Sequence, residues 1–192
     1  MYLPKAFNID DPQKVFSFIE NNAFGQLIST VDGRLFSTHI PFLIADDRVT
    51  ISGHVAKKNP QWEHILQQEV LITLQGPHGY ISPSAYISPG VPTWDYQTVH
   101  IYGTCQVFHE PERLSNLVDN LTEKYERDRD APWTPNYNES MLKAIVGLEI
   151  SITDIQCKYK VSQNRSVQER EQVAEQLERS GSLQLAEAVR NE

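Results

Sequence analysis

The sequence predicts a mainly β fold with added helices, arranged as a small closed or nearly closed barrel. About six segments show strand character and are separated by regular turn signals. The helical patterns are short or lie towards the C-terminal end. Several neighbouring strand segments are joined by connections too short for the crossover that parallel strands require. Strands in this order with helical additions are typical of a barrel rather than of a parallel α/β sheet.

The composition is that of a globular protein with one main domain. The chain has 192 residues, of which 40% are hydrophobic and 22% are charged. It carries 25 Asp and Glu against 17 Lys and Arg, a formal net charge of -8. A surface of this sign does not attract phosphate backbones as a whole, so any anion site must be local.

Other bulk features predict a cytoplasmic protein without a membrane segment. Cys105 and Cys157 stand alone, without a CxxC pair, which favours a reducing compartment and free thiols. No apolar run approaches the roughly 20 residues that a spanning helix needs. The N-terminus MYLPKAFNIDD lacks the apolar centre of a signal peptide.

The first part of the chain predicts a helix followed by three strands. Asp10, Asp11 and Pro12 are typical of a helix start, and the helix is expected to end near residue 22. FGQLISTV and RLFSTHIPFLI read as strands around a tight Asp32-Gly33 turn, and Pro41 indicates a sheet edge or a bend. Alternation predicts a third strand over residues 48–53.

The next elements follow from caps and periodicity. Asn59 and Pro60 predict the cap and first position of a short helix. Strands are expected over 70–75 and 98–108, and the four prolines between them predict a long ordered loop, whose length suggests a function. Helical spacing begins at Glu112, and a second short helix is expected around residues 141–145. A strand over 148–161 precedes two helices broken at residues 180–182.

The stretch SGHVAKKNPQW, residues 52–62, is a candidate anion site. A strand end, a turn with His54, Lys57 and Lys58, and a helix starting at Asn59 would offer backbone amides, a positive dipole end and two ammonium groups. A terminal phosphate fits that set. The alternative is that both lysines lie on a solvated turn and His54 satisfies a strand end.

A second candidate is KYKVSQNRSVQER, residues 158–170, where a strand passes into a helix. Its polar side chains would converge on a ligand as fixed donors. In the alternative, Asn164 or Ser166 caps the helix and Arg165 lies on the surface.

A third candidate combines aromatic and hydroxyl residues of YISPSAY and VPTWDYQTVHIYG. Aromatic rings beside a flat conjugated ligand supply stacking area, although such rings are also common in cores and interfaces. Other reaction classes lack their motifs: the sequence has no HExxH, P-loop, GxGxxG or GxSxG pattern, so no metal site is predicted and no catalytic residue is assigned.

In this order the three clusters resemble the PaiB family of FMN-binding negative transcriptional regulators. The resemblance covers essentially the whole chain, through MYLPKAFN, STHIPFLI, GHVAKKNPQW, GYISPSAY, VPTWDYQTVHIYG and KVSQNR. It implies an FMN-binding split barrel related to the pyridoxamine phosphate oxidases, assembled as a homodimer with FMN near the subunit boundary. NRSVQER is similar to the NRLHDR pattern of those oxidases but departs from it at the centre, so oxidase activity on pyridoxamine is not implied.

The resemblance also implies roles for particular residues. His54, Lys57, Lys58 and Asn59 would hold the FMN phosphate. The isoalloxazine edge would lie along Thr38, His39 and Ile40, and Trp94 would close the site from the partner subunit. A third set, near the flavin or a second ligand, would be Gln163, Asn164 and Arg165.

For function, the resemblance implies a transcriptional repressor. We expect two domains, a split barrel over residues 1–165 and a helical extension over residues 166–192. DNA is a possible partner for which the charge of the segment 166–192 gives weak support, because this segment contains more Glu than Arg. The alternative is an enzyme on the same barrel: a flavin reductase, a flavin-dependent oxidoreductase acting on a small molecule, or a haem-degrading relative.

Overall fold

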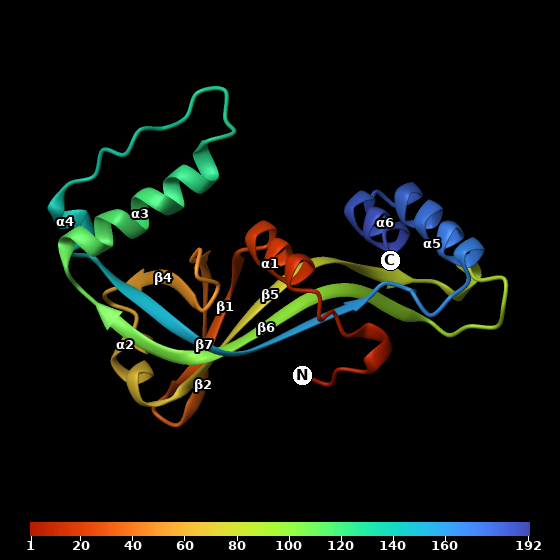
Figure 1. The fold of residues 1–192 in the computed structure, drawn as a ribbon, viewed down its shortest axis with the longest axis horizontal. Coiled ribbons are helices and arrows are strands. Elements are labelled where there is room, and N and C mark those ends of the chain that lie inside the picture. Colours follow the sequence, from red (N-terminus) through yellow and green to blue (C-terminus); the bar gives the residue numbers. More distant parts are fainter. The chain divides into compact units, whose positions relative to one another are not determined.

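The computed structural model describes the backbone of residues 1–192 and the side chains of residues 1–66, 68–138 and 140–192. Seven strands form one sheet, and helices precede, interrupt and follow it (Figure 1). The strands are β1 (Phe24–Val31), β2 (Arg34–Pro41), β3 (Leu43–Ile44), β4 (Thr50–Ala56), β5 (Glu69–Ile81), β6 (Thr93–Phe108) and β7 (Ile145–Lys160). The helices are α1 (Pro12–Asn21), α2 (Gln61–His64), α3 (Pro111–Glu126), α4 (Glu139–Leu142), α5 (Val167–Arg179) and α6 (Leu183–Arg190), with 3-10 turns η1 (Lys5–Phe7), η2 (Ile65–Gln67) and η3 (Pro83–Ala85).

The strand order in the sheet is β2-β1-β5-β6-β7-β4-β3. The pairs β1–β2, β1–β5, β3–β4 and β4–β7 are antiparallel. For β1–β2 and β3–β4 this agrees with the short connections between them. The sequence predicted about six strands, and the additional one is β3, which has only two residues. The mainly β prediction is therefore confirmed.

The turn between β1 and β2 has the geometry that its sequence predicts. Asp32 has φ 49° and Gly33 has φ 75°, so both central residues are left-handed, as a type I′ hairpin turn requires. Strand β2 is an outer strand of the sheet and ends at Pro41, where a residue without an N–H is tolerated.

The chain divides into two compact units. We call Ile19–Leu74 with Ile101–Ile155 the central unit, and Met1–Phe18 with Gln75–His100 and Gln156–Glu192 the terminal unit. Strands β5, β6 and β7 each contribute residues to both units. The predicted boundary at residue 165 divides the chain differently and stays a prediction.

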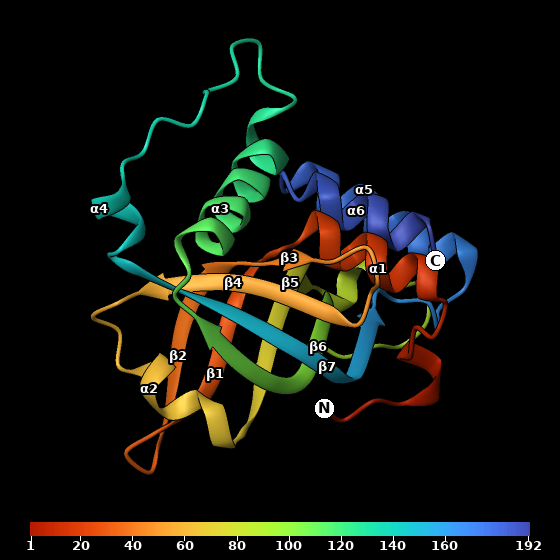
Figure 2. The same cartoon turned by 60° about the vertical axis from the view of Figure 1, so that its left-hand side comes forward.

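The central unit has an apolar core and a smaller cluster beneath α3. Its fully buried side chains include Leu27, Phe42, Ile51, Ile72 and Leu148. Helix α3 packs over the edge formed by β3 and β4 (Figure 2), where it forms the smaller cluster. That cluster consists of Phe108, Leu114, Leu117 and Leu121, with Leu43, Leu142 and Ile145 against it.

The terminal unit contains the helix pair α5 and α6, which lie side by side (Figure 1). The predicted break is confirmed, since α5 ends at Arg179 and α6 begins at Leu183. Ser166 caps α5 by accepting from the N–H of Glu169, and the Glu169 carboxylate accepts in return from the Ser166 N–H. No helix in the described part of the chain is both long and apolar enough to cross a bilayer.

The prediction of a long loop over residues 76–96 is wrong at both ends. Strand β5 continues to Ile81 and β6 already begins at Thr93, so the irregular segment is 82–92. The register of β5 with β1 ends at Leu74, and Pro77 lies beyond that point. A proline there removes no ladder hydrogen bond to β1, which is why the strand continues through it.

Candidate functional site

The turn between β4 and α2 carries the candidate anion site. Lys57 and Lys58 are both exposed on it. Among the described side chains, no carboxylate forms an ion pair with either ammonium group. Two adjacent lysines without internal counter-charges leave a local positive potential in an acidic protein.

Backbone and side-chain hydrogen bonds hold this turn. The Lys57 N–H donates to Ala144 O at 2.8 Å, and the Asn59 N–H donates to Ala56 O at 2.8 Å. Trp62 Nε1 donates to Lys57 O at 3.0 Å. The backbone that carries the two lysines is therefore fixed while their ammonium groups remain in solvent.

The same turn is joined to β2 through a polar network. Asn59 Nδ2 donates to Thr38 Oγ1 at 2.8 Å, and Thr38 Oγ1 donates to Gln61 Oε1 at 2.7 Å. Asn59 Oδ1 accepts from the Gln61 N–H at 2.9 Å, so the residue predicted to cap α2 does bond its first residue. Thr38 was predicted to line the isoalloxazine edge and Asn59 to hold the phosphate, and the structure brings the two residues into direct contact.

His54 lies on β4 opposite Gly147 of β7 and is partly buried. Burial lowers the pKa of the His54 imidazole below its ordinary value. Its Nδ1 atom is buried and has no hydrogen-bond partner among the described residues. His54 is therefore neutral at neutral pH, and the positive charge of the turn comes from the lysines.

Three successive residues of β2 differ in how much of them a ligand can reach. Thr38 is half-buried and engaged in the network above. His39 is exposed and stacks on Phe24, with ring centroids 6.2 Å apart. The Ile40 side chain is in the core, at 6% exposure, so only its backbone is left for a ligand.

The remaining predicted residues belong to the terminal unit. Trp94 is 57% exposed and meets Tyr80 edge-on, with centroids 6.2 Å apart. Lys160 Nζ donates to Thr93 Oγ1 at 2.7 Å and to Trp94 O at 2.6 Å. Lys160 therefore fixes the start of β6 and leaves the indole of Trp94 free at the surface.

Gln163 and Arg165 make local bonds that occupy their polar groups. Gln163 Oε1 accepts from the Val161 N–H at 2.8 Å. The Arg165 guanidinium lies 4.0 Å from the centre of the Tyr86 ring, and its Nη1 donates to Ser88 Oγ at 3.1 Å. Asn164 is exposed. Of the two interpretations of this segment, helix capping holds for Ser166, and Arg165 packs on the segment 82–92.

Sequence reasoning missed the burial of several polar residues, including an amide and two carboxylates. Gln61 is completely buried, Asp95 is 1% exposed and Glu169 is 6% exposed. Burial raises the pKa of Asp95, although Ser162 and Lys160 bond its carboxylate. Hydrogen bonds from Ser88 and Ser166 lower the pKa of Glu169 to about 2. Only Glu169 had a local signal, the capping-box spacing after Ser166.

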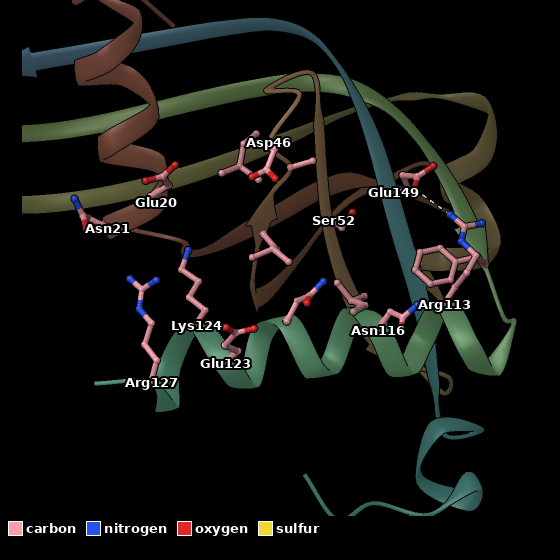
Figure 3. A pocket seen from close by; sticks show the side chains of 16 residues that line it. Glu20, Asn21, Asp46, Ser52, Arg113, Asn116, Glu123, Lys124, Arg127 and Glu149 are labelled. Carbon is pink, nitrogen blue, oxygen red and sulfur yellow. Dashed lines mark hydrogen bonds and ion pairs between the residues drawn. The ribbon is translucent and has the colours of Figure 1, made fainter. Parts of the chain in front are cut away.

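A polar cleft of about 940 Å³ lies beside α3 in the central unit and contains none of the predicted site residues. In Figure 3 the labelled side chains on the α3 side are Arg113, Asn116, Glu123 and Lys124 of the helix and Arg127 just after it. Those across the cleft include Glu20, Asp46, Ser52 and Glu149. One ion pair, Arg113 to Glu149 at 2.9 Å, spans it. Burial lowers the pKa of Lys124, and the negative charge of Glu20 partly offsets this shift.

The comparisons with known proteins identify the family. A family model described as "Putative FMN-binding domain" matches residues 1–154. The "Protease synthase and sporulation protein PAI 2" of Bacillus subtilis is 41% identical over 200 residues, which cover 98% of this chain and 96% of that protein. The chain belongs to the PaiB family. A second relative, an uncharacterized protein of Aspergillus fumigatus, is 30% identical over 86% of both chains.

Solved structures support the fold alone. A flavocytochrome from Azotobacter vinelandii superposes with a TM-score of 0.65 at 15% identity, covering 80% of this chain and 69% of that one. An FAD- and heme-binding protein from Mycobacterium smegmatis gives 0.64 at 14% identity, covering 80% and 73%. The predicted split-barrel fold is confirmed, and FMN is the cofactor that the family match assigns.

The residues of the β4–α2 turn fit the chemistry of FMN. Its terminal phosphate is an anion, and Lys57 and Lys58 offer two ammonium donors that no described carboxylate neutralises. The buried Nδ1 of His54 has unused hydrogen-bonding capacity. Among the described residues, no three His, Cys, Asp or Glu side chains gather as a metal site requires.

Proposed function

We propose that this protein is an FMN-dependent negative regulator of transcription of the PaiB type, and that the turn from Lys57 to Asn59 binds the FMN phosphate. The observation that carries the proposal is the pair of exposed lysines on a turn held by hydrogen bonds, without a described counter-charge. The 41% identity over nearly the whole length to PAI 2 supports the family role.

The flavin ring would extend from the phosphate along β2. Thr38 and His39 present a hydroxyl and an exposed imidazole there, while Ile40 offers its backbone. When bound, FMN supplies one- and two-electron redox chemistry. Cys105 is buried and burial raises the pKa of its thiol to about 12, so this cysteine would not act as a nucleophile.

The protein would act as a homodimer. The exposed rings of Trp94 and Tyr80 in the terminal unit support this, since large aromatic side chains are enriched in interfaces. Trp94 of the partner subunit would then cover the flavin. Gln163 and Arg165 would contribute indirectly, by holding the turn before α5 and the segment 82–92.

Regulation would not depend on DNA contact by α5 and α6. Two of the three arginines on this pair lie against carboxylates: Arg190 is 2.8 Å from Glu171 and 2.5 Å from Glu178, and Arg179 is 3.9 Å from Glu175. A reader of DNA presents unneutralised cations to the phosphates. A partner protein, or basic residues elsewhere on a dimer, would then connect the flavin state to transcription.

Three measurements test the proposal. The purified protein should show the visible spectrum of a flavin and release FMN on denaturation. Deleting the gene should raise transcription of its target genes. Reporters for protease synthesis and sporulation come first, because the PAI 2 relative is named for those processes. Turnover of NAD(P)H by the flavoprotein, with unchanged transcription in the deletion strain, would instead establish the oxidoreductase alternative.

A further inference from the structure

We propose that Gln61 is a positioning residue for the FMN phosphate: its buried side chain locks Asn59 through Thr38 and thereby presets the turn that carries Lys57 and Lys58. The inference rests on the phosphate site proposed above. It adds a residue that does not touch the ligand and that the sequence did not single out.

The Gln61 side chain is completely buried and uses its whole amide. Its Nε2 donates to Ser29 Oγ at 2.8 Å and to Leu27 O at 3.1 Å, both on β1. Its Oε1 accepts from Thr38 Oγ1 of β2 at 2.7 Å. A buried amide with partners on two strands has one orientation available, so Gln61 is a fixed point between the sheet and α2.

From this fixed point a closed ring of hydrogen bonds reaches the turn. The Thr38 hydroxyl accepts from Asn59 Nδ2 at 2.8 Å, and Asn59 Oδ1 accepts from the Gln61 N–H at 2.9 Å. Asn59 follows Lys58 directly in the chain. Because both the oxygen and the nitrogen of the Asn59 amide are bonded, the backbone that carries the two lysines is held in place. A turn that is ordered before binding loses less conformational entropy when it binds the phosphate.

The chemistry requires an amide at position 61. A methionine of similar length would leave the Thr38 hydroxyl without its acceptor and Ser29 without its donor. A glutamate would direct a carboxylate oxygen at Leu27 O, which is also an acceptor. The methionine would release Thr38, and with it the Asn59 end of the ring. The glutamate would keep an acceptor for Thr38 but would lose the bonds that hold the side chain to β1.

The central unit contains a matched control. Gln68 Nε2 donates to Thr30 O at 2.8 Å and to His64 O at 2.7 Å, and its Oε1 accepts from the Thr30 N–H at 2.7 Å. Gln68 thus also ties a helical segment to β1 by its amide. None of these bonds reaches the turn from Lys57 to Asn59.

The test compares two ligands, FMN and riboflavin, which differ by the phosphate. Equilibrium titrations of the full-length Gln61→Met protein should show FMN affinity weakened about tenfold, the loss of roughly one charge-assisted contact. Riboflavin affinity should fall by clearly less, because both ligands share the proposed ring contact at Thr38 and only FMN uses the turn. Gln68→Met should leave the FMN-to-riboflavin ratio unchanged. An unchanged ratio in Gln61→Met, or a parallel loss of both ligands, would overturn the inference.

A second readout needs no flavin. In the flavin-free protein, amide hydrogen exchange at Asn59 and Gln61 should accelerate in Gln61→Met and not in Gln68→Met. If Gln61→Met does not fold, Thr38→Val opens the same ring and Thr38→Ser keeps the hydroxyl. The valine variant should lower the FMN-to-riboflavin ratio and the serine variant should restore it. Equal ratios in the two would count against the ring.

The double variant Lys57→Ala/Lys58→Ala separates failure of this inference from failure of the proposed function. If that variant leaves the FMN-to-riboflavin ratio unchanged, the turn does not bind phosphate and both ideas fall. If it lowers the ratio while Gln61→Met does not, the phosphate site stands and only the positioning role of Gln61 is wrong.

Discussion

Replacing Lys57 and Lys58 together by alanine should weaken FMN binding about 150-fold. Neither ammonium pairs with a described carboxylate, so the change breaks no internal ion pair and leaves no buried charge unpaired. A charge-assisted hydrogen bond contributes about 1.5 kcal/mol at the low end, which suits exposed groups. Two such contacts give about 3 kcal/mol, and each 1.36 kcal/mol is a factor of ten. Folding stability should not change, because both side chains are exposed.

The assay is equilibrium titration with FMN and with riboflavin at low and moderate salt. Wild-type affinity for FMN should fall as salt rises, and the double variant should show a flatter dependence, because screening acts on the removed charges. The control is Arg34→Ala/Arg179→Ala, which lowers the net charge equally at exposed positions that the proposed site does not include. A loss of less than threefold for FMN, or an equal loss for riboflavin, would refute the phosphate site.

Three further predictions concern the fold around the site. Cys105 and Cys157 should not react with a thiol reagent at pH 8 until the protein unfolds, since burial raises the pKa of each thiol to about 12; rapid labelling of the native protein would contradict this. Gly147→Ala should lower the free energy of unfolding in urea by about 1–3 kcal/mol, because a Cβ there would lie 2.2 Å from the Phe108 ring; an unchanged midpoint would show that the ring moves freely. Burial lowers the pKa of His54, so the unfolded state binds more protons below about pH 6.5 and stability should fall as the pH drops from 7.5 to 5.5. His54→Asn should reduce this dependence of stability on pH. The same dependence in the wild-type and His54→Asn proteins would show that His54 does not cause it.

The predictable part of the fold is the part that local sequence determines. Asp32 and Gly33 form a left-handed turn because few other pairs adopt those dihedral angles. The spacing of Ser166 and Glu169 is by itself enough to predict their capping box. In the same way, the turn with Lys57 and Lys58 could be located between a strand and a helix before any coordinates existed.

The unpredictable part depends on partners far away in the chain. Residues 93–97 belong to β6. The buried Asp95 accepts hydrogen bonds there from Ser162 and Lys160, which come more than sixty positions later in the chain. Pro77 seemed to exclude a strand, yet it lies where β1 no longer pairs with β5. Proline and turn-forming residues predict a loop only when the opposite strand is known.

The same limit applies to the site. Gln61 stands inside the stretch that attracted attention, but a glutamine between Pro60 and Trp62 carries no sign of burial. Its partners on β1 and β2 are 23 to 34 positions earlier. Gln163 and Arg165 show the opposite case, in which polar groups predicted to bind a ligand make internal bonds. Gln163 donates to Tyr159 O and accepts from the Val161 N–H, and Arg165 donates to Ser88 Oγ.

The most direct test of the account is a crystal structure of the full-length protein with FMN bound. The phosphate should lie within hydrogen-bond distance of Lys57 Nζ or Lys58 Nζ, with the Gln61–Thr38–Asn59 ring intact beneath the turn. A phosphate bound elsewhere, for instance in the cleft beside α3, with both lysines still in solvent, would contradict the central claim.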